Sequence, residues 1–184
     1  MIKKANFEEA IGVYKYMQED FLDSEIPNFK RFLKMTQENI HNVYIYEEDV
    51  QEIAYFITME KNEKVLITHL AVIKEYRGKG IGKRFLESIK EFLSDKKILI
   101  VEVESEKNAK NGEELQVIEK RLRYYLNSGF KKCEGMEYIL FGVDYYILTY
   151  SGFTNKISNH EVKQIIEDIY DGLFPKENLI IKHI

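Results

Sequence analysis

The chain has 184 residues, with 27 Lys and Arg against 31 Asp and Glu, so its formal net charge is -4. This length fits one domain with a single core, and the negative charge argues against a nucleic acid as the main partner. Hydrophobic residues make up 45% of the chain and aromatic residues 13%, which is enough apolar surface to offset the entropy of folding. Disorder is therefore excluded as the main state.

Cysteine and histidine are too few or too scattered for a disulfide or a metal site. Cys133 is the only cysteine, so no intramolecular disulfide can form and a reducing compartment is expected. His41, His160 and His183 lack metal-ligand spacing, so no metal is expected. No apolar run is long enough to cross a bilayer. We expect a soluble, cytoplasmic protein without a membrane partner.

The first elements are predicted to be a short strand and two helices. Ile2 to Ala5 reads as the strand, and Asn6 with Glu9 forms a capping box that starts the first helix. Pro27 and Asn28 mark the start of the next element. Apolar residues near helical spacing then predict a second helix that ends before His41: Phe29, Phe32, Leu33 and Ile40.

The pattern then changes to three consecutive antiparallel strands, which are rich in β-branched and aromatic residues. They are Val43 to Tyr46, Ile53 to Met59 and Val65 to Val72. The third is nearly continuous in apolar residues, as expected of a central strand covered on both faces.

A glycine loop, a helix and another strand follow. Ile81, Phe85, Ile89 and Phe92 give the helix its apolar face, and Ile98 to Val103 is the strand. A strand, helix, strand unit of this kind predicts a parallel pair joined by a right-handed crossover.

The last elements are a helix, closing strands and a C-terminal extension. Leu115, Ile118, Leu122 and Tyr125 mark the helix, which stops at Gly129. The closing strands are predicted at Phe130 to Lys132, Tyr138 to Phe141 and Tyr145 to Tyr150, around a turn at Gly142 to Asp144. Residues 151–184 then add a helix capped by Ser158 or Asn159 and a final strand, Leu179 to Ile184. This extension could cover a sheet edge or pair with a second subunit in a homodimer.

The loop Arg77 to Lys83 has the composition of an anion site. Glycines let the backbone approach an anion closely, and the amides of a first helical turn point at it. The loop does not match the Walker A motif, because Arg84 follows Gly82-Lys83 where that motif needs Ser or Thr. The loop does not match the dinucleotide-binding fingerprint either, because Lys83 stands where that fingerprint has its third glycine. The plain alternative is that the glycines only make a tight turn.

The loop does match Arg/Gln-x-x-Gly-x-Gly/Ala, as Arg77 to Gly82 after Leu70-Ala71-Val72. In this motif and in its order of elements, the chain resembles the GNAT superfamily of acyl-CoA-dependent N-acyltransferases over residues 1–150. The resemblance implies an α+β fold with a mixed, mostly antiparallel central sheet, a parallel pair of strands after the CoA loop, and helices on both faces. The 151–184 extension lies outside the match and is expected to belong to the same domain.

The resemblance also implies the donor site. Loop amides would hold the pyrophosphate of acetyl-CoA, backbone groups beside it would bond the pantetheine arm, and the thioester would lie between Val65 to Val72 and Ile98 to Glu104. The predicted donor-binding residues are Leu70, Ala71, Val72, Arg77, Gly78, Lys79, Gly80, Ile81, Gly82 and Lys83.

Acetyl transfer to an amine needs an acid for the thiolate and a base for the ammonium. Tyr125 lies in Tyr124-Tyr125-Leu126-Asn127-Ser128-Gly129-Phe130, which is similar to the family's segment whose tyrosine protonates the CoA sulfur. Its other interpretation is a core aromatic. Glu102 and Glu104 share one strand face and are the base candidates, with Glu104 preferred. Either glutamate could instead be a solvated charge at a strand end.

Three hypotheses follow. The first is an N-acetyltransferase that moves an acetyl group from acetyl-CoA to a primary amine of a small molecule or peptide by direct attack. The second is a non-catalytic acyl-CoA-binding or sensing module. The third is an interaction protein built around residues 151–184, and it would not bind CoA.

Overall fold

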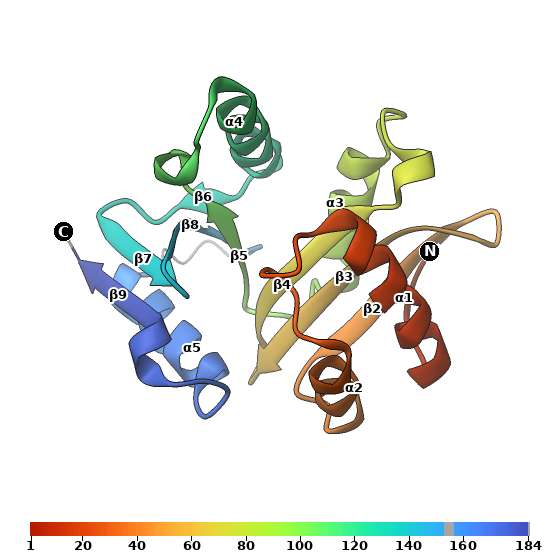
Figure 1. Ribbon diagram of the computed structural model, residues 1–184, viewed down its shortest axis with the longest axis horizontal. Coiled ribbons are helices and arrows are strands. Elements are labelled where there is room, and N and C mark those ends of the chain that lie inside the picture. The colour runs from red at the N-terminus through yellow and green to blue at the C-terminus, as the bar shows by residue number, and fades with distance from the viewer. Residues whose placement is uncertain (153–156, 184) are drawn as a thin grey trace. The chain divides into compact units, whose positions relative to one another are not determined.

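The computed structural model describes residues 1–152 and 157–183 (Figure 1). They form two compact units: Met1–Glu60 with Ile67–Asp95, and Lys61–Leu66 with Lys96–Ile184. Strand β4 contributes to both units, since its first residues fall in the second one. In the described part of the chain, no helix has the length and apolar character that crossing a membrane requires.

Four strands form the sheet of the first unit in the order β1-β2-β3-β4. Tight hairpins join the last three, and both turn residues of each hairpin have positive φ: Asp49 and Val50, then Asn62 and Glu63. Two such residues in succession give a turn whose twist matches that of the strands. The strands are β1 (Ile2–Lys4), β2 (Asn42–Glu48), β3 (Gln51–Lys61) and β4 (Lys64–Val72).

Helices cover both faces of this sheet. Val43 and Ile45 of β2 belong to the apolar core that α1 (Phe7–Asp20) and α2 (Phe29–Gln37) form. Alternate side chains point the other way, where the Phe85 ring of α3 (Ile81–Phe92) lies 5.2 Å from that of Tyr46 and 5.9 Å from that of Phe56. The predicted capping box of α1 is confirmed, because Asn6 and Glu9 cap each other's backbone.

The second unit is built on β5 (Ile98–Glu104), which neighbours β4 in the parallel sense and is followed in the sheet by β8 (Val143–Tyr150), β7 (Met136–Leu140) and β9 (Leu179–His183). The predicted mixed sheet with one parallel pair is thus confirmed. The remaining elements are β6 (Lys131–Lys132), which pairs with β8, α4 (Gly112–Leu126), α5 (Asn159–Tyr170) and the 3-10 turns η1 (Lys74–Tyr76), η2 (Glu106–Asn108) and η3 (Lys176–Asn178).

Helices α4 and α5 lie on opposite faces of the β5–β8–β7 sheet (Figure 1). Tyr125 of α4 packs on Phe130, which packs on Tyr150 of β8. Tyr150 pairs with Leu99, whereas Glu102 pairs with Ile147, so Tyr150 and Glu102 point to different faces. Tyr170 of α5 contacts Glu102. Strand alternation therefore separates the α4 side chains from the α5 side chains.

The extension closes the edge of β7 within the same chain. β9 pairs antiparallel with β7 from Met136↔His183 to Leu140↔Leu179, and the Phe141 amide donates to the Asn178 carbonyl at 2.8 Å. Of the predicted final strand, Ile184 lies outside the described residues.

Among the predicted element ends that differ from the structure, two have a clear backbone cause. Ile40 lies outside α2, because the helix ends at Gln37 and Asn39 has φ 53°. Phe141 is a turn residue rather than a strand residue, because Phe141 and Gly142 both have positive φ, at 50° and 81°, and β8 already begins at Val143. Left-handed backbone at a residue other than glycine leaves little trace in the sequence.

Val50 is a β-branched residue at φ 66°, and its side chain is 94% exposed. This backbone conformation crowds Cβ, and no packing offsets the strain. We predict that Val50→Gly, which creates the Asp-Gly turn preferred here, raises the free energy of unfolding by about 1 kcal/mol in urea titrations. The control is Val117→Gly on the exposed side of α4 (56% exposed), which should lower it by about 0.5–1 kcal/mol. A destabilised Val50→Gly would contradict the assigned turn.

Candidate functional site

The predicted glycine loop connects η1 to α3 and lies at the surface of the first unit. Gly78 and Gly80 have φ 79° and 72°, and nothing lies within 4 Å of a Cβ built on either residue. Glycine is therefore favoured here by backbone conformation and not by crowding. The open space above both residues leaves the backbone accessible to a ligand.

The N-terminus of α3 has no side-chain cap. Its N-cap residue is Gly80, whereas a side chain caps every other α-helix among the described residues: Asn6, Asn28, Asn111 and Ser158. The first amides of a helix have no acceptor within the helix and carry the positive end of its dipole. The loop and α3 thus offer backbone donors that suit a phosphate group.

The cations near the loop differ in how free they are to bind an anion. The Arg84 guanidinium is paired with Glu48, at 3.1 Å between nitrogen and oxygen. Lys79 Nζ donates to the Glu75 carbonyl at 3.3 Å and lies 5.4 Å from the centre of the Tyr76 ring. Lys83 is exposed on the first turn of α3. An anion at the loop would meet backbone amides first and these flexible cations second.

Arg77 anchors the start of the loop. Its Nε donates to the Val72 carbonyl at 2.8 Å, and its guanidinium pairs with the Asp20 carboxylate, whose side chain is only 3% exposed. The other oxygen of Asp20 accepts from the Tyr55 hydroxyl at 2.8 Å. The side chain of Arg77 is therefore engaged in holding α1, β3 and the loop together, which leaves its backbone as the part that can face a ligand.

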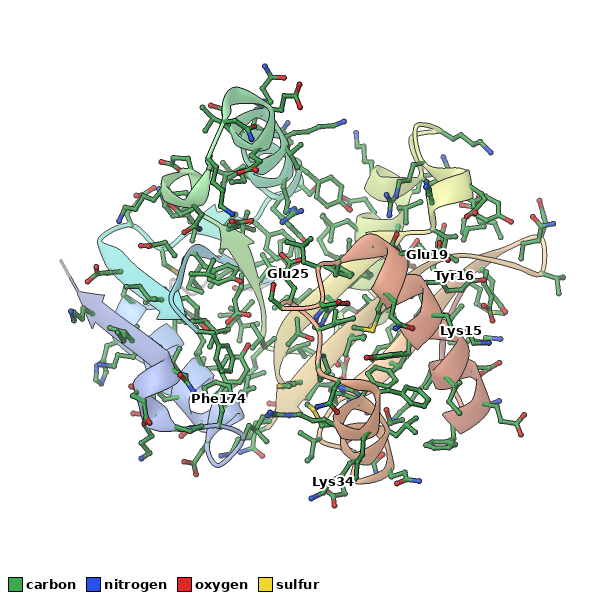
Figure 2. The ribbon with its side chains drawn as sticks, in the orientation of Figure 1. Lys15, Tyr16, Glu19, Glu25, Lys34 and Phe174 are labelled. Atoms are coloured by element: carbon green, nitrogen blue, oxygen red, sulfur yellow. The ribbon has the colours of Figure 1, made fainter. Side chains whose placement is uncertain are left out.

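The C-terminal half of β4 is less covered than its N-terminal half. Val65, Leu66 and Ile67 are buried, whereas Leu70 and Val72 are half-buried around buried Ala71. His69 bonds Thr68 Oγ1 through Nδ1 and the Glu25 carbonyl through Nε2, each at 3.1 Å, and Glu25 lies between α1 and α2 (Figure 2). Burial lowers the pKa of His69, so it serves here as a neutral, hydrogen-bonded residue.

Tyr125, the candidate acid, lies in the second unit. It is 8% exposed, and its ring centre is 5.0 Å from that of Tyr124 and 5.4 Å from that of Phe130. Burial raises the pKa of its hydroxyl to about 12, with Arg121 opposing the shift. Tyr125 thus keeps its proton at neutral pH. It packs as a core aromatic, as one of its two interpretations predicts, and its role as the acid stays a prediction.

Glu102, a candidate base, accepts hydrogen bonds from two tyrosines. Tyr138 of β7 donates to Oε1, and Tyr170 of α5 donates to both oxygens, at 3.1 and 3.0 Å. Burial raises the pKa of Glu102 to about 7, while the two hydroxyls lower it. The carboxyl is therefore poised to exchange a proton near neutrality.

Glu104 points to the same face of β5 and pairs in register with Tyr145 of β8. The face that carries both glutamates is opposite to the face on which Tyr125 packs. The structure thus brings the two glutamates together and separates them from the tyrosine by the thickness of the sheet.

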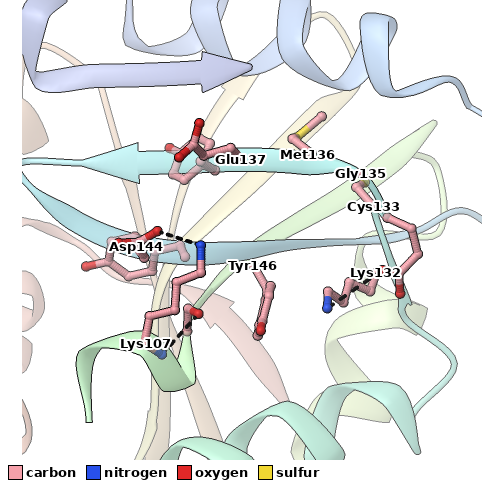
Figure 3. Close-up of a pocket in the computed structure, with 12 residues that line it drawn as sticks. Lys107, Lys132, Cys133, Gly135, Met136, Glu137, Asp144 and Tyr146 are labelled. Atoms are coloured by element: carbon pink, nitrogen blue, oxygen red, sulfur yellow. Dashed lines mark hydrogen bonds and ion pairs between the residues drawn. The ribbon is translucent and has the colours of Figure 1, made fainter. Parts of the chain in front are cut away.

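A pocket of about 180 Å³ opens on the α4 side of β8 (Figure 3). Lys107 forms an ion pair with Asp144 at 3.5 Å, and Lys132 Nζ lies 3.7 Å from the centre of the Tyr146 ring. Burial raises the pKa of Cys133 in the same pocket to about 11, which keeps the thiol protonated. Among the described residues, no three His, Cys, Asp or Glu side chains gather as a metal site would require.

The profile of the GNAT acetyltransferase domain matches residues 39–132, which include β2 to β6, the glycine loop, Glu102 and Tyr125. The chain therefore belongs to the GNAT acetyltransferases. Comparison with curated proteins finds no match.

Solved structures give the GNAT fold as well. A putative GNAT-family acetyltransferase from Bacteroides thetaiotaomicron superposes with a TM-score of 0.76 at 18% identity, covering 95% of this chain and 98% of that one. A spermidine N-acetyltransferase from Vibrio cholerae gives 0.61 at 11% identity, covering 82% and 92%. A Bacillus subtilis acetyltransferase in complex with CoA gives 0.59 at 14% identity, covering 83% and 98%. At these identities the likeness concerns the fold.

Three residues of the candidate site in this GNAT chain were not predicted from the sequence: Asp20, Tyr138 and Tyr170. Asp20 had no motif around it, and it meets Arg77 across 57 positions. Tyr138 was predicted only as a strand residue, and Tyr170 was given no role. Their polarity within apolar elements was the available signal, since a buried hydroxyl usually has a partner.

Gly80→Ala should test the backbone of the loop. Because φ is 72° and no neighbour crowds Cβ, the substitution should lower the free energy of unfolding by about 1–2 kcal/mol through backbone strain alone. The matched control is Gly12→Ala inside α1, where nothing lies within 4 Å of the added Cβ and a gain of up to about 1 kcal/mol is expected. Equal effects of the two substitutions in urea titrations would refute the left-handed loop.

Proposed function

We propose that this chain transfers the acetyl group of acetyl-CoA to a primary amine by direct attack, with no covalent enzyme intermediate. The observation that carries the proposal is the glycine loop at the uncapped N-terminus of α3, inside a domain that belongs to the GNAT acetyltransferases. Uncapped amides at a helix start favour the pyrophosphate of a CoA donor.

In the proposed donor site, the backbone of residues 77–83 holds the pyrophosphate. The half-covered end of β4, at Leu70, Ala71 and Val72, hydrogen-bonds the pantetheine arm. The Val72 carbonyl already accepts from Arg77, so it contributes less to the arm than its neighbours do. The CoA complex of the Bacillus subtilis acetyltransferase, which has this fold, supports CoA as the donor.

The chemistry divides between two side chains. Glu102 takes a proton from the acceptor ammonium, and the neutral amine attacks the thioester carbonyl to form a tetrahedral intermediate. The carbon–sulfur bond then breaks, Tyr125 gives its proton to the departing thiolate, and the nitrogen releases its second proton to solvent. The products are the acetylated amine and CoA, and solvent returns the two enzyme groups to their starting protonation. Glu104, on the same face as Glu102, contributes negative charge that favours a cationic acceptor.

The acidities of these groups support their roles. A base works best with a pKa close to the operating pH, and that of Glu102 is about 7. An acid must hold its proton until the thiolate forms, and Tyr125 does so with a pKa of about 12.

We propose a cytoplasmic amine, free or on a peptide, as the acceptor class. The Vibrio cholerae enzyme of the same fold acts on spermidine, which makes polyamines a natural first test. The main alternative is a sensing module that binds acetyl-CoA without transferring its acetyl group.

Acetyl-CoA should stabilise the folded chain and be consumed when an amine is present. At a concentration about 100-fold above Kd, binding should raise Tm by about 5–10 °C. With a panel of spermidine, free amino acids and a lysine peptide, mass spectrometry should find one acetylated amine for each free CoA thiol. Binding without transfer to any amine would favour the sensing module, and an unchanged Tm would refute both hypotheses.

Tyr125→Phe should lower kcat by about 100-fold and leave the Kd for acetyl-CoA within about two-fold, since only the proton donor is lost. Tyr124→Phe, the neighbouring residue on α4, is the matched control and should keep its kcat. Steady-state rates and calorimetric titration with acetyl-CoA provide the comparison. If the two variants turn over at the same rate, Tyr125 is not the acid.

A further inference from the structure

The Glu102 cluster joins three elements that are distant in sequence. Glu102 is in β5, Tyr138 is 36 residues away in β7, and Tyr170 is 68 residues away at the last position of α5. Tyr170 lies beyond residues 39–132, where the GNAT profile matches. The C-terminal extension thus supplies a donor to a carboxylate of the acetyltransferase domain.

Packing fixes the orientation of both tyrosines. Tyr138 is 1% exposed and Tyr170 is 7% exposed. The Tyr170 ring lies 5.1 Å from that of Phe174, labelled in Figure 2, and Phe174 packs in turn on Phe141 at 4.8 Å in the β7–β8 turn. The Tyr138 ring lies 6.2 Å from that of Tyr145. Buried rings with few alternative rotamers hold their hydroxyls in place.

In the Glu102 cluster, the two tyrosine hydroxyls donate the hydrogen bonds and the carboxylate accepts them. An ionised carboxylate only accepts, and each phenol has one proton to donate. Tyr170 reaches both oxygens of Glu102 and Tyr138 reaches Oε1, so both phenols stabilise the ionised form. The pKa values of both tyrosines are raised well above normal, so they remain donors.

We propose that Tyr170 is a positioning residue for Glu102, and that α5 is for this reason part of the acetyl-transfer machinery. The inference rests on the proposed function, because it takes Glu102 as the base. The hydroxyl of Tyr170 holds the carboxylate in one orientation and favours its ionised form, while Tyr138 provides a second donor to Oε1.

The titratable groups described around Glu102 come from β5, β7, β8 and α5. Tyr138 faces it from β7 and Tyr170 from α5, while Tyr145 of β8 lies beside both tyrosines. Glu104 shares the face of β5. Burial is the largest influence on the pKa of Glu102 and the two phenols oppose it, so the loss of one phenol should raise that pKa.

Tyr170→Phe tests the proposal, because it removes one oxygen and keeps the packed ring. The pKa of Glu102, followed by carboxyl carbon NMR on glutamate-labelled protein and assigned with Glu102→Gln, should rise by about one unit. The acidic limb of kcat/KM, measured with acetyl-CoA and the amine that the panel above shows to react fastest, should move equally. The loss should be about five-fold at pH 7 and nearly absent at pH 9, with KM for the amine little changed.

Tyr146→Phe is the matched control, since this tyrosine of the neighbouring strand β8 points to the opposite face. It should leave both the titration of Glu102 and the pH profile unchanged. An unmoved Glu102 titration in Tyr170→Phe overturns the positioning role, whether or not transfer is observed. If Glu102→Gln is inactive while Tyr170→Phe keeps the wild-type limb, only the role of Tyr170 is lost. A fully active Glu102→Gln removes the base on which both proposals rest.

Discussion

The glycine loop is anchored by one ion pair, in which the carboxylate is buried and the guanidinium is half exposed. Asp20 ends α1 with its side chain 3% exposed, and it receives the guanidinium of Arg77 and the hydroxyl of Tyr55. A charge removed from water in this way needs its partners, because an unpaired carboxylate in the same place would be strongly destabilising. The pair therefore fixes the residue at which the loop begins. The left-handed glycines that follow then leave α3 without a side-chain cap and with its amides open.

In the second unit, strand alternation places the proposed acid, Tyr125, and the proposed base, Glu102, on opposite faces of the sheet. Neighbouring residues of β5 face α4 or α5, so a tyrosine that packs on the α4 side and a glutamate on the α5 side have different surroundings. Burial acts on both groups and raises both pKa values. The phenol of Tyr125 stays protonated, whereas the pKa of the Glu102 carboxyl comes close to neutral pH. A single physical cause thus shifts the pKa values of the proposed acid and of the proposed base.

Local signals predicted the fold well, and long-range contacts account for what was missed. The Asn6 capping box, the apolar run of β4 and the glycines of the loop are each specified within a few residues, and the GNAT resemblance supplied the mixed sheet with its parallel pair. The partners of Glu102 could not be predicted in this way. They depend on the register of β7 and on where α5 ends, which tertiary packing decides. Strand alternation places Glu102 and Glu104 on one face and does not distinguish them, so the preference for Glu104 as the base stays a prediction.

The most direct test of the account is the response of the loop amides to the donor. In ¹H–¹⁵N spectra, titration with acetyl-CoA should shift the amides of Gly78, Lys79 and Gly80 most strongly, with the downfield change expected when an amide donates to a phosphate oxygen. Gly12, inside α1, should remain unshifted. Saturable binding that leaves the three loop amides in place, or no binding at all, would contradict the claim that this loop holds the donor.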